Sequence, residues 1–178
     1  MKSTNLERQI IAAKQASENI FSINNNTRKK VLIDLSFKLL RHTQKIIAAN
    51  KRDISAAIKE GRNESFIERL TLDQGRIKSM ADSVKSIANQ ADVLFKKLEE
   101  KNMPSGIKIQ KVRVPIGLIA IIFESRPNVT IDAFTLAFKS GNAVILKGGK
   151  EIKRTNHELV NLIKKILSEN KISPEMIQ

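Results

Sequence analysis

The chain of 178 residues contains no cysteine, no tryptophan and no tyrosine. The missing cysteine excludes disulfide bonds, zinc ribbons, iron–sulfur clusters and any thiol nucleophile supplied by these residues. There is no run of 18 or more apolar residues, which a membrane-spanning helix would need, and no secretory signal pattern at the start. With apolar residues at 41%, the sequence predicts a soluble globular protein of the cytoplasm that does not bind membranes.

Basic residues outnumber acidic ones by 32 to 18, which gives a formal net charge of +14. Such an excess attracts polyanions and would suit a protein that binds nucleic acid. The excess is spread over both halves of the chain, however, and the seven phenylalanines do not alternate with basic residues as a base-stacking surface would require. The pattern argues against nucleic acid. A non-catalytic basic helical protein that binds nucleic acid or a partner chain remains the alternative interpretation.

Residues 1–92 are predicted to form a helical amino-terminal segment, because apolar residues recur at helical spacing. Asn26 or Thr27 is a suitable N-cap for the second helix. A short helix is expected at about 51–60, and a longer one follows with Asp73 as its N-cap.

After residue 92 the pattern changes. Residues 93–106 are polar and are predicted to be an exposed connection. A bridging strand is expected next, at residues 107–114. Residues 118–123 and 143–146 are apolar runs typical of parallel strands that are covered on both faces.

Helical patterns follow both of these strands. Gly141 is a suitable C-cap for the first helix, and Thr155 with Glu158 forms a possible capping box for the second. The order strand, helix, strand, helix predicts an α/β fold in which residues 107–178 begin a doubly wound, Rossmann-like parallel sheet. Because two strands do not complete such a sheet, the chain is expected to be a truncated part of a larger domain.

Polar segments follow both buried strands, at residues 124–130 and 147–151. Ligands of open α/β sheets bind beyond the carboxyl ends of the strands, where helix N-termini favour anions. We therefore expect Asn128 and Lys147 to lie at the same edge of the sheet. Neither segment is a standard phosphate motif. The plainer alternative is a pair of polar turns, with Asn128 as a helix N-cap.

Three segments carry a specific family pattern: residues 114–117 (VPIG), 123–132 (FESRPNVTID) and 139–149 (KSGNAVILKGG). They resemble the glutamyl phosphate reductases, also called glutamate-5-semialdehyde dehydrogenases, of the aldehyde dehydrogenase superfamily. Weaker similarity lies at residues 48–53 and 68–72. The chain resembles the amino-terminal part of this family only.

The resemblance implies an NADP(H)-dependent oxidoreductase of proline biosynthesis. In this family L-glutamyl 5-phosphate is reduced to L-glutamate 5-semialdehyde with release of phosphate, through a cysteine thiolate that holds the acyl group. The family's cysteine lies beyond the matched part, so the chain alone is expected to be inactive. A shortened polypeptide, a decayed gene product and one half of an enzyme with a separate carboxyl-terminal half all remain open. The full-length family is expected to form homo-oligomers.

The resemblance also implies roles for individual residues. Asn128 corresponds to an asparagine whose side-chain amide donates to the developing oxyanion. Lys147 corresponds to a lysine that contacts the adenosine ribose of the cofactor and could also meet a 2′-phosphate. Gly148 and Gly149 would let the backbone pass close to the nucleotide.

Arg126 and Ser125 are the candidate substrate-binding residues. Arg126 could hold a carboxylate or phosphate through its guanidinium fork, or it could pair with Glu124 and only shape the loop. His42 and His157 have no second ligand at metal-binding spacing, so no metal site is expected.

Overall fold

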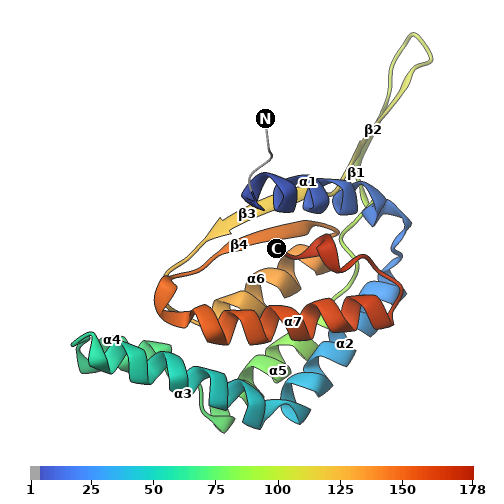
Figure 1. Cartoon of the computed structure of the whole chain (residues 1–178). Helices are drawn as coiled ribbons and strands as arrows, with labels where there is room; N and C mark the ends of the chain where they lie inside the picture. Colours follow the sequence, from blue (N-terminus) through green and yellow to red (C-terminus); the bar gives the residue numbers. More distant parts are fainter. Residues whose placement is uncertain (1–4) are drawn as a thin grey trace.

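The computed structural model describes residues 5–178, so the first four residues, which the signal-sequence prediction included, lie outside the described residues. A helical half is followed by a hairpin and then by a small α/β unit (Figure 1). None of the helices in residues 5–178 has the length and apolar character that a transmembrane segment requires. The elements are α1 (Asn5–Glu18), η1 (Asn19–Ser22), α2 (Asn25–Arg41), α3 (Thr43–Lys59), α4 (Glu64–Leu70), α5 (Gln74–Asn89), β1 (Lys97–Asn102), β2 (Lys108–Val112), β3 (Leu118–Ile122), α6 (Asn128–Lys139), β4 (Ala143–Lys147), η2 (Lys150–Ile152), α7 (Lys153–Glu169) and η3 (Pro174–Met176).

Of the helix N-caps predicted for the first half of the chain, one is confirmed and one is wrong. Asp73 accepts a hydrogen bond from the backbone N–H of Arg76 at 2.7 Å, which confirms it as the N-cap of α5. The N-cap of α2 is Asn24, whose side chain accepts from the Thr27 N–H at 2.9 Å. The prediction of Asn26 or Thr27 was wrong, because three successive asparagines offer the same chemistry and only Asn24 has the extended backbone of an N-cap, whereas Asn25 already begins the helix.

The expected short helix at 51–60 was wrong in extent. It is the second half of α3, which begins at Thr43, and the chain breaks at His42, the C-cap of α2. The apolar stripe of α2 continues into α3 without a change of period, so spacing alone does not reveal the break.

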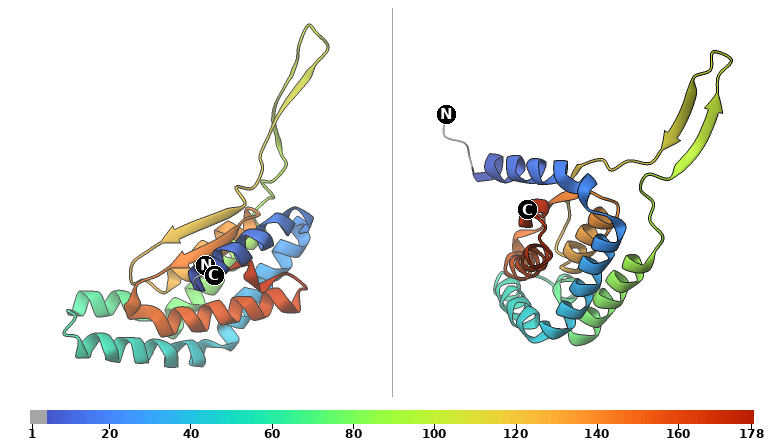
Figure 2. Two further views of the ribbon diagram at one scale, coloured as in Figure 1. Left: turned by 45° about the horizontal axis from the view of Figure 1, so that its top comes forward. Right: turned by 90° about the vertical axis from the view of Figure 1, so that its right-hand side faces the viewer.

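The residues predicted as an exposed connection contain a strand. β1 pairs with β2 in antiparallel register, from Lys97 opposite Val112 to Asn102 opposite Lys108. Both strands are exposed along their whole length, and the hairpin projects away from the rest of the molecule (Figures 1 and 2). β1 was missed because none of its side chains is buried, so it carries no alternating apolar pattern.

The expected parallel pair is confirmed. β3 and β4 pair in parallel, from Leu118 opposite Ala143 to Ile122 opposite Lys147, with α6 as the crossover. On the other side of β4, Ile177 forms an isolated parallel bridge with Val144. The expectation that β3 is covered on both faces was wrong, since the Ile122 side chain is 83% exposed.

The helical half and the α/β unit share one hydrophobic core. Leu35 and Val84 from the helical half lie in the same cluster as Phe134, Phe138 and Leu159 from the α/β unit, and each is at most 1% exposed. The division into residues 1–92, 93–106 and 107–178 stays a prediction.

The turn between α6 and β4 holds the segment that precedes β3 in place. Gly141 follows the last turn of α6 with φ +73°, as predicted for a C-cap glycine. The side-chain oxygen of Asn142 accepts from the backbone N–H groups of Ile116 and Gly117 at 2.7 and 2.8 Å. These bonds hold the segment before β3 against the turn before β4.

The predicted capping box of Thr155 and Glu158 was wrong. The N-terminus of α7 is capped by Asp53 of α3, which accepts from the backbone N–H and the hydroxyl of Thr155, both at 2.7 Å. Asp53 is 1% exposed and also pairs with Arg154 at 3.3 Å. Because carboxylates stabilise helix N-termini, the helical half fixes the start of α7, a few residues after Lys147.

Candidate active site

The loops that follow β3 and β4 lie at one edge of the sheet. Ile122 and Lys147 are register partners at the ends of the two strands, so both loops start side by side. Asn128 is the first residue of α6 and Lys147 the last residue of β4. This confirms that both residues lie at the carboxyl edge of the sheet.

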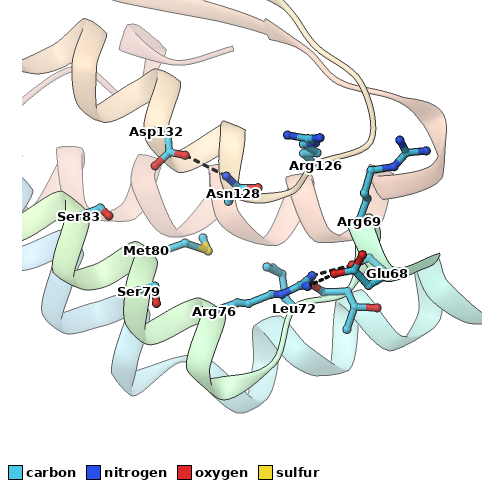
Figure 3. Close-up of a pocket in the computed structure, with 11 residues that line it drawn as sticks. Glu68, Arg69, Leu72, Arg76, Ser79, Met80, Ser83, Arg126, Asn128 and Asp132 are labelled. Atoms are coloured by element: carbon cyan, nitrogen blue, oxygen red, sulfur yellow. Dashed lines mark hydrogen bonds and ion pairs between the residues drawn. The ribbon is translucent and has the colours of Figure 1, made fainter. Parts of the chain in front are cut away.

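A pocket of about 490 Å³ lies between the α4–α5 region and the start of α6 (Figure 3). Arg126, Asn128 and Asp132 line it from the α6 side. Arg69 of α4 and Met80 of α5 line it from the helical half. The structure thus brings two predicted site residues together with residues that lie far away in the sequence.

Asn128 presents its side chain to this pocket. The N-cap position of α6 is occupied by Pro127, which makes no side-chain cap bond, so the interpretation of Asn128 as an N-cap was wrong. The amide Nδ2 of Asn128 donates to Oδ2 of Asp132 at 3.1 Å. Because an amide nitrogen carries two N–H groups, one donor stays available for a ligand.

Of the three arginines that line the pocket, Arg69 and Arg126 have no carboxylate partner within residues 5–178. The third, Arg76, pairs with Glu68 at 2.6 Å. The guanidinium of Arg69 lies over the ring of Phe66, 5.7 Å from its centroid. Arg126 contacts Glu124 through its backbone N–H, and their side chains form no ion pair in the described part of the chain. Arg69 and Arg126 therefore leave positive charge available to an anion.

Asp132 is the acidic group of the α6 wall. Burial raises the pKa of its carboxyl, and the hydrogen bond from Asn128 lowers that pKa in part. The partner that the structure gives this carboxylate is thus a neutral amide rather than a cation. A carboxylate in such surroundings is stabilised by any cation that enters the pocket.

Ser125 does not line this pocket. It is 8% exposed, and its hydroxyl donates to Oε2 of Glu151 at 3.1 Å. The structure thus brings Ser125 to the loop after β4 and leaves Arg126 beside Asn128.

The residues expected to hold NADP(H) are Lys147, Gly148 and Gly149. The ammonium of Lys147 is exposed, donates to the Gly148 carbonyl at 3.3 Å and forms no ion pair in residues 5–178, so it fits a phosphate or a ribose hydroxyl. A Cβ at Gly148 would lie 2.3 Å from Nδ2 of Asn156, and one at Gly149 would lie 2.7 Å from Oγ of Ser125. Here the glycines allow the chain's own side chains to pack closely, and they shape the loop that follows Lys147.

Arg69 and Asp132 are pocket residues that the sequence analysis did not single out. Two signals were present. Asp132 follows Asn128 by one helical turn, and Arg69 lies in the segment of weaker family similarity. Neither signal tells which helices face each other.

Comparison with known proteins identifies relatives over part of their length. No family model matches the chain. The gamma-glutamyl phosphate reductase of Legionella pneumophila strain Philadelphia 1 is 42% identical over 175 residues, which are 98% of this chain and 41% of the relative. The chain therefore spans about two fifths of the length of this curated relative.

Solved structures agree with this result. The gamma-glutamyl phosphate reductases of Thermotoga maritima and Saccharomyces cerevisiae match with TM-scores of 0.94 and 0.91, at 30% and 29% identity. The match covers 98% of this chain in both cases, and 42% and 46% of the two enzymes. The succinic semialdehyde dehydrogenase of Streptococcus pyogenes shares the fold at 18% identity, with a TM-score of 0.68. The chain is thus similar, over nearly its whole length, to the amino-terminal part of gamma-glutamyl phosphate reductases, and it has the fold of the corresponding part of aldehyde dehydrogenases.

Proposed function

We propose that the chain supplies the amino-terminal part of a reductase that converts L-glutamyl 5-phosphate to L-glutamate 5-semialdehyde with NADPH and releases phosphate, a step of proline biosynthesis. The observation that carries this proposal is the side chain of Asn128. Within residues 5–178 it keeps one N–H without an acceptor, in a pocket that also contains the guanidinium of Arg126, which has no ion-pair partner in the same part of the chain. Similarity to reductases along 98% of the chain supports it.

Asn128 donates to the oxygen of the reacting acyl group. A neutral donor that is already oriented costs no rearrangement when negative charge develops on that oxygen. The hydrogen bond to Asp132 fixes the rotation of the amide, so that the nitrogen and not the oxygen of the side chain lies toward Asp132. Removal of one such donor lowers the rate by roughly 100- to 1000-fold.

Arg126 binds the phosphate of the substrate. Its guanidinium suits two oxygens of one phosphate, and no carboxylate in residues 5–178 competes for it. Arg69 adds a second positive charge at the same pocket.

Lys147 holds the phosphate or ribose of the cofactor, and Gly148 with Gly149 shapes the loop beside it. NADPH supplies hydride when it is bound. The nucleophilic thiol comes from the part of the relatives that this chain does not span, since these 178 residues contain no cysteine. We place this enzyme in the cytoplasm as a homo-oligomer.

A fusion enzyme tests the proposal. Residues 1–178 are joined to the carboxyl-terminal part of the Legionella pneumophila reductase that the chain does not span. The fusion is expected to oxidise glutamate 5-semialdehyde with NADP and phosphate, measured by NADPH absorbance, and the 178-residue chain alone is expected to show none. A folded fusion without turnover, judged by circular dichroism and size-exclusion chromatography, would contradict the proposal.

A further inference from the structure

We propose that Asp132 binds the α-ammonium group of the substrate and thereby selects an amino acid over a plain dicarboxylic acid. This inference rests on the proposed function and assigns one more contact in the same pocket. The polar groups of the pocket lie in a definite order. Arg69 and Arg126 lie toward one end in Figure 3, Asp132 lies toward the other, and Asn128 lies between Arg126 and Asp132.

This order matches the order of groups along the substrate. In L-glutamyl phosphate the phosphate is at one end, the acyl carbon follows, and the amino group lies further along the chain. With the phosphate at Arg126 and the acyl oxygen at Asn128, the amino group extends toward Asp132.

The spacing also matches. The side chains of Asn128 and Asp132 meet at 3.1 Å, so a ligand that accepts from the second N–H of Asn128 lies beside Asp132. Four bonds separate the acyl carbon of a glutamyl chain from its amino nitrogen, or roughly 5 Å when extended. The amino group of a ligand held at Asn128 is therefore within reach of the Asp132 carboxylate.

The charges are complementary as well. The pocket presents two guanidinium groups without a carboxylate partner in residues 5–178, and one carboxylate whose hydrogen-bond partner is a neutral amide. The phosphate of the substrate suits the two guanidinium groups at one end of the pocket, and its ammonium group suits the carboxylate at the other end. A half-buried carboxylate gains from an ammonium because burial penalises its lone charge.

Two probes of equal length test the assignment. L-glutamate and glutarate share their carbon chain and both carboxylates, and only glutamate has the amino group. Dissociation constants of both are measured by NMR titration of the isotope-labelled 178-residue chain. The unaltered chain is expected to bind L-glutamate about tenfold more tightly than glutarate, as for a hydrogen bond between charged groups at a partly exposed site.

The variant Asp132→Asn keeps the shape and the acceptor for Asn128 but removes the charge. It is expected to bind both probes about equally, because only the ammonium contact is lost. The matched control is Asp82→Asn, which alters an exposed carboxylate of α5 outside the pocket. This control should keep the tenfold preference. If the carboxylate of Asp132 only supported Asn128, its replacement would leave the ratio of the dissociation constants for L-glutamate and glutarate unchanged.

Three results would overturn the assignment: equal affinity of the unaltered chain for both probes, a preserved preference in Asp132→Asn, or no binding of either probe. Failure of the proposed function is a different result. A preference that depends on Asp132, found together with a folded but inactive fusion enzyme, would leave amino-acid recognition in place and reject the reductase.

Discussion

Replacing Asp53 by alanine should destabilise the fold far more than the loss of an ordinary helix cap. Asp53 is 1% exposed and accepts from the Thr155 N–H and hydroxyl, both at 2.7 Å. Loss of an N-cap side chain costs about 1 kcal/mol. A buried donor left without an acceptor costs about 1–3 kcal/mol more. The Asp53→Ala variant should therefore lose about 3 kcal/mol, a large part of the 5–15 kcal/mol typical of a domain.

The free energy of unfolding is measured by urea denaturation. Far-ultraviolet circular dichroism is the suitable signal, because the chain has no tryptophan or tyrosine. Asp73→Ala is the matched control, since Asp73 is exposed and caps α5 through one bond of 2.7 Å to the Arg76 N–H. It should cost about 1 kcal/mol. Asp53→Asn should fall between the two, because one oxygen still accepts. A loss in Asp53→Ala no larger than in Asp73→Ala would refute the reasoning.

Asp132→Asn should be more stable than the unaltered chain at neutral pH, because folding raises the pKa of this carboxyl. The folded state of the unaltered chain then binds more protons than its unfolded state. Its free energy of unfolding therefore falls as pH rises from the unfolded pKa through the folded pKa of Asp132. Urea denaturation at several pH values should show the advantage shrinking toward pH about 3.9, and an advantage that grows on acidification would contradict it. Lys147→Gln in the fusion enzyme should raise the KM for NADPH by about tenfold, as for one lost charge-assisted contact, with kcat nearly unchanged. An unchanged KM would remove Lys147 from the cofactor site. The 178-residue chain alone should give no NADPH-dependent turnover, because no side chain in it forms a thiolate, and turnover in a preparation free of other reductase would contradict this.

Features set by local chemistry could be predicted from the sequence. The two parallel strands were predicted because buried strands have continuous apolar runs, and the α5 cap because Asp73 stands just before a helical pattern. The positions of Asn128 and Lys147 followed from the rule that ligand sites lie at the carboxyl edge of such a sheet.

Features set by tertiary contacts could not be predicted in this way. Asp53 caps α7 across more than a hundred residues, so no local pattern reveals it. Arg69 becomes a pocket residue only because α4 and α5 pack beside the start of α6. β1 is exposed and polar. It is a strand because its backbone pairs with β2, and it has no buried face that an apolar pattern could reveal.

The most direct test of the account is the rate of the fusion enzyme with Asn128 replaced by alanine. In the proposed reaction the second N–H of this amide, which is not used by Asp132, donates to the oxyanion that develops on the acyl group. The kcat of Asn128→Ala should therefore fall by roughly 100- to 1000-fold, with little change in KM. A kcat within a factor of about three of the unaltered fusion, in a variant with the same circular dichroism spectrum, would contradict the central claim.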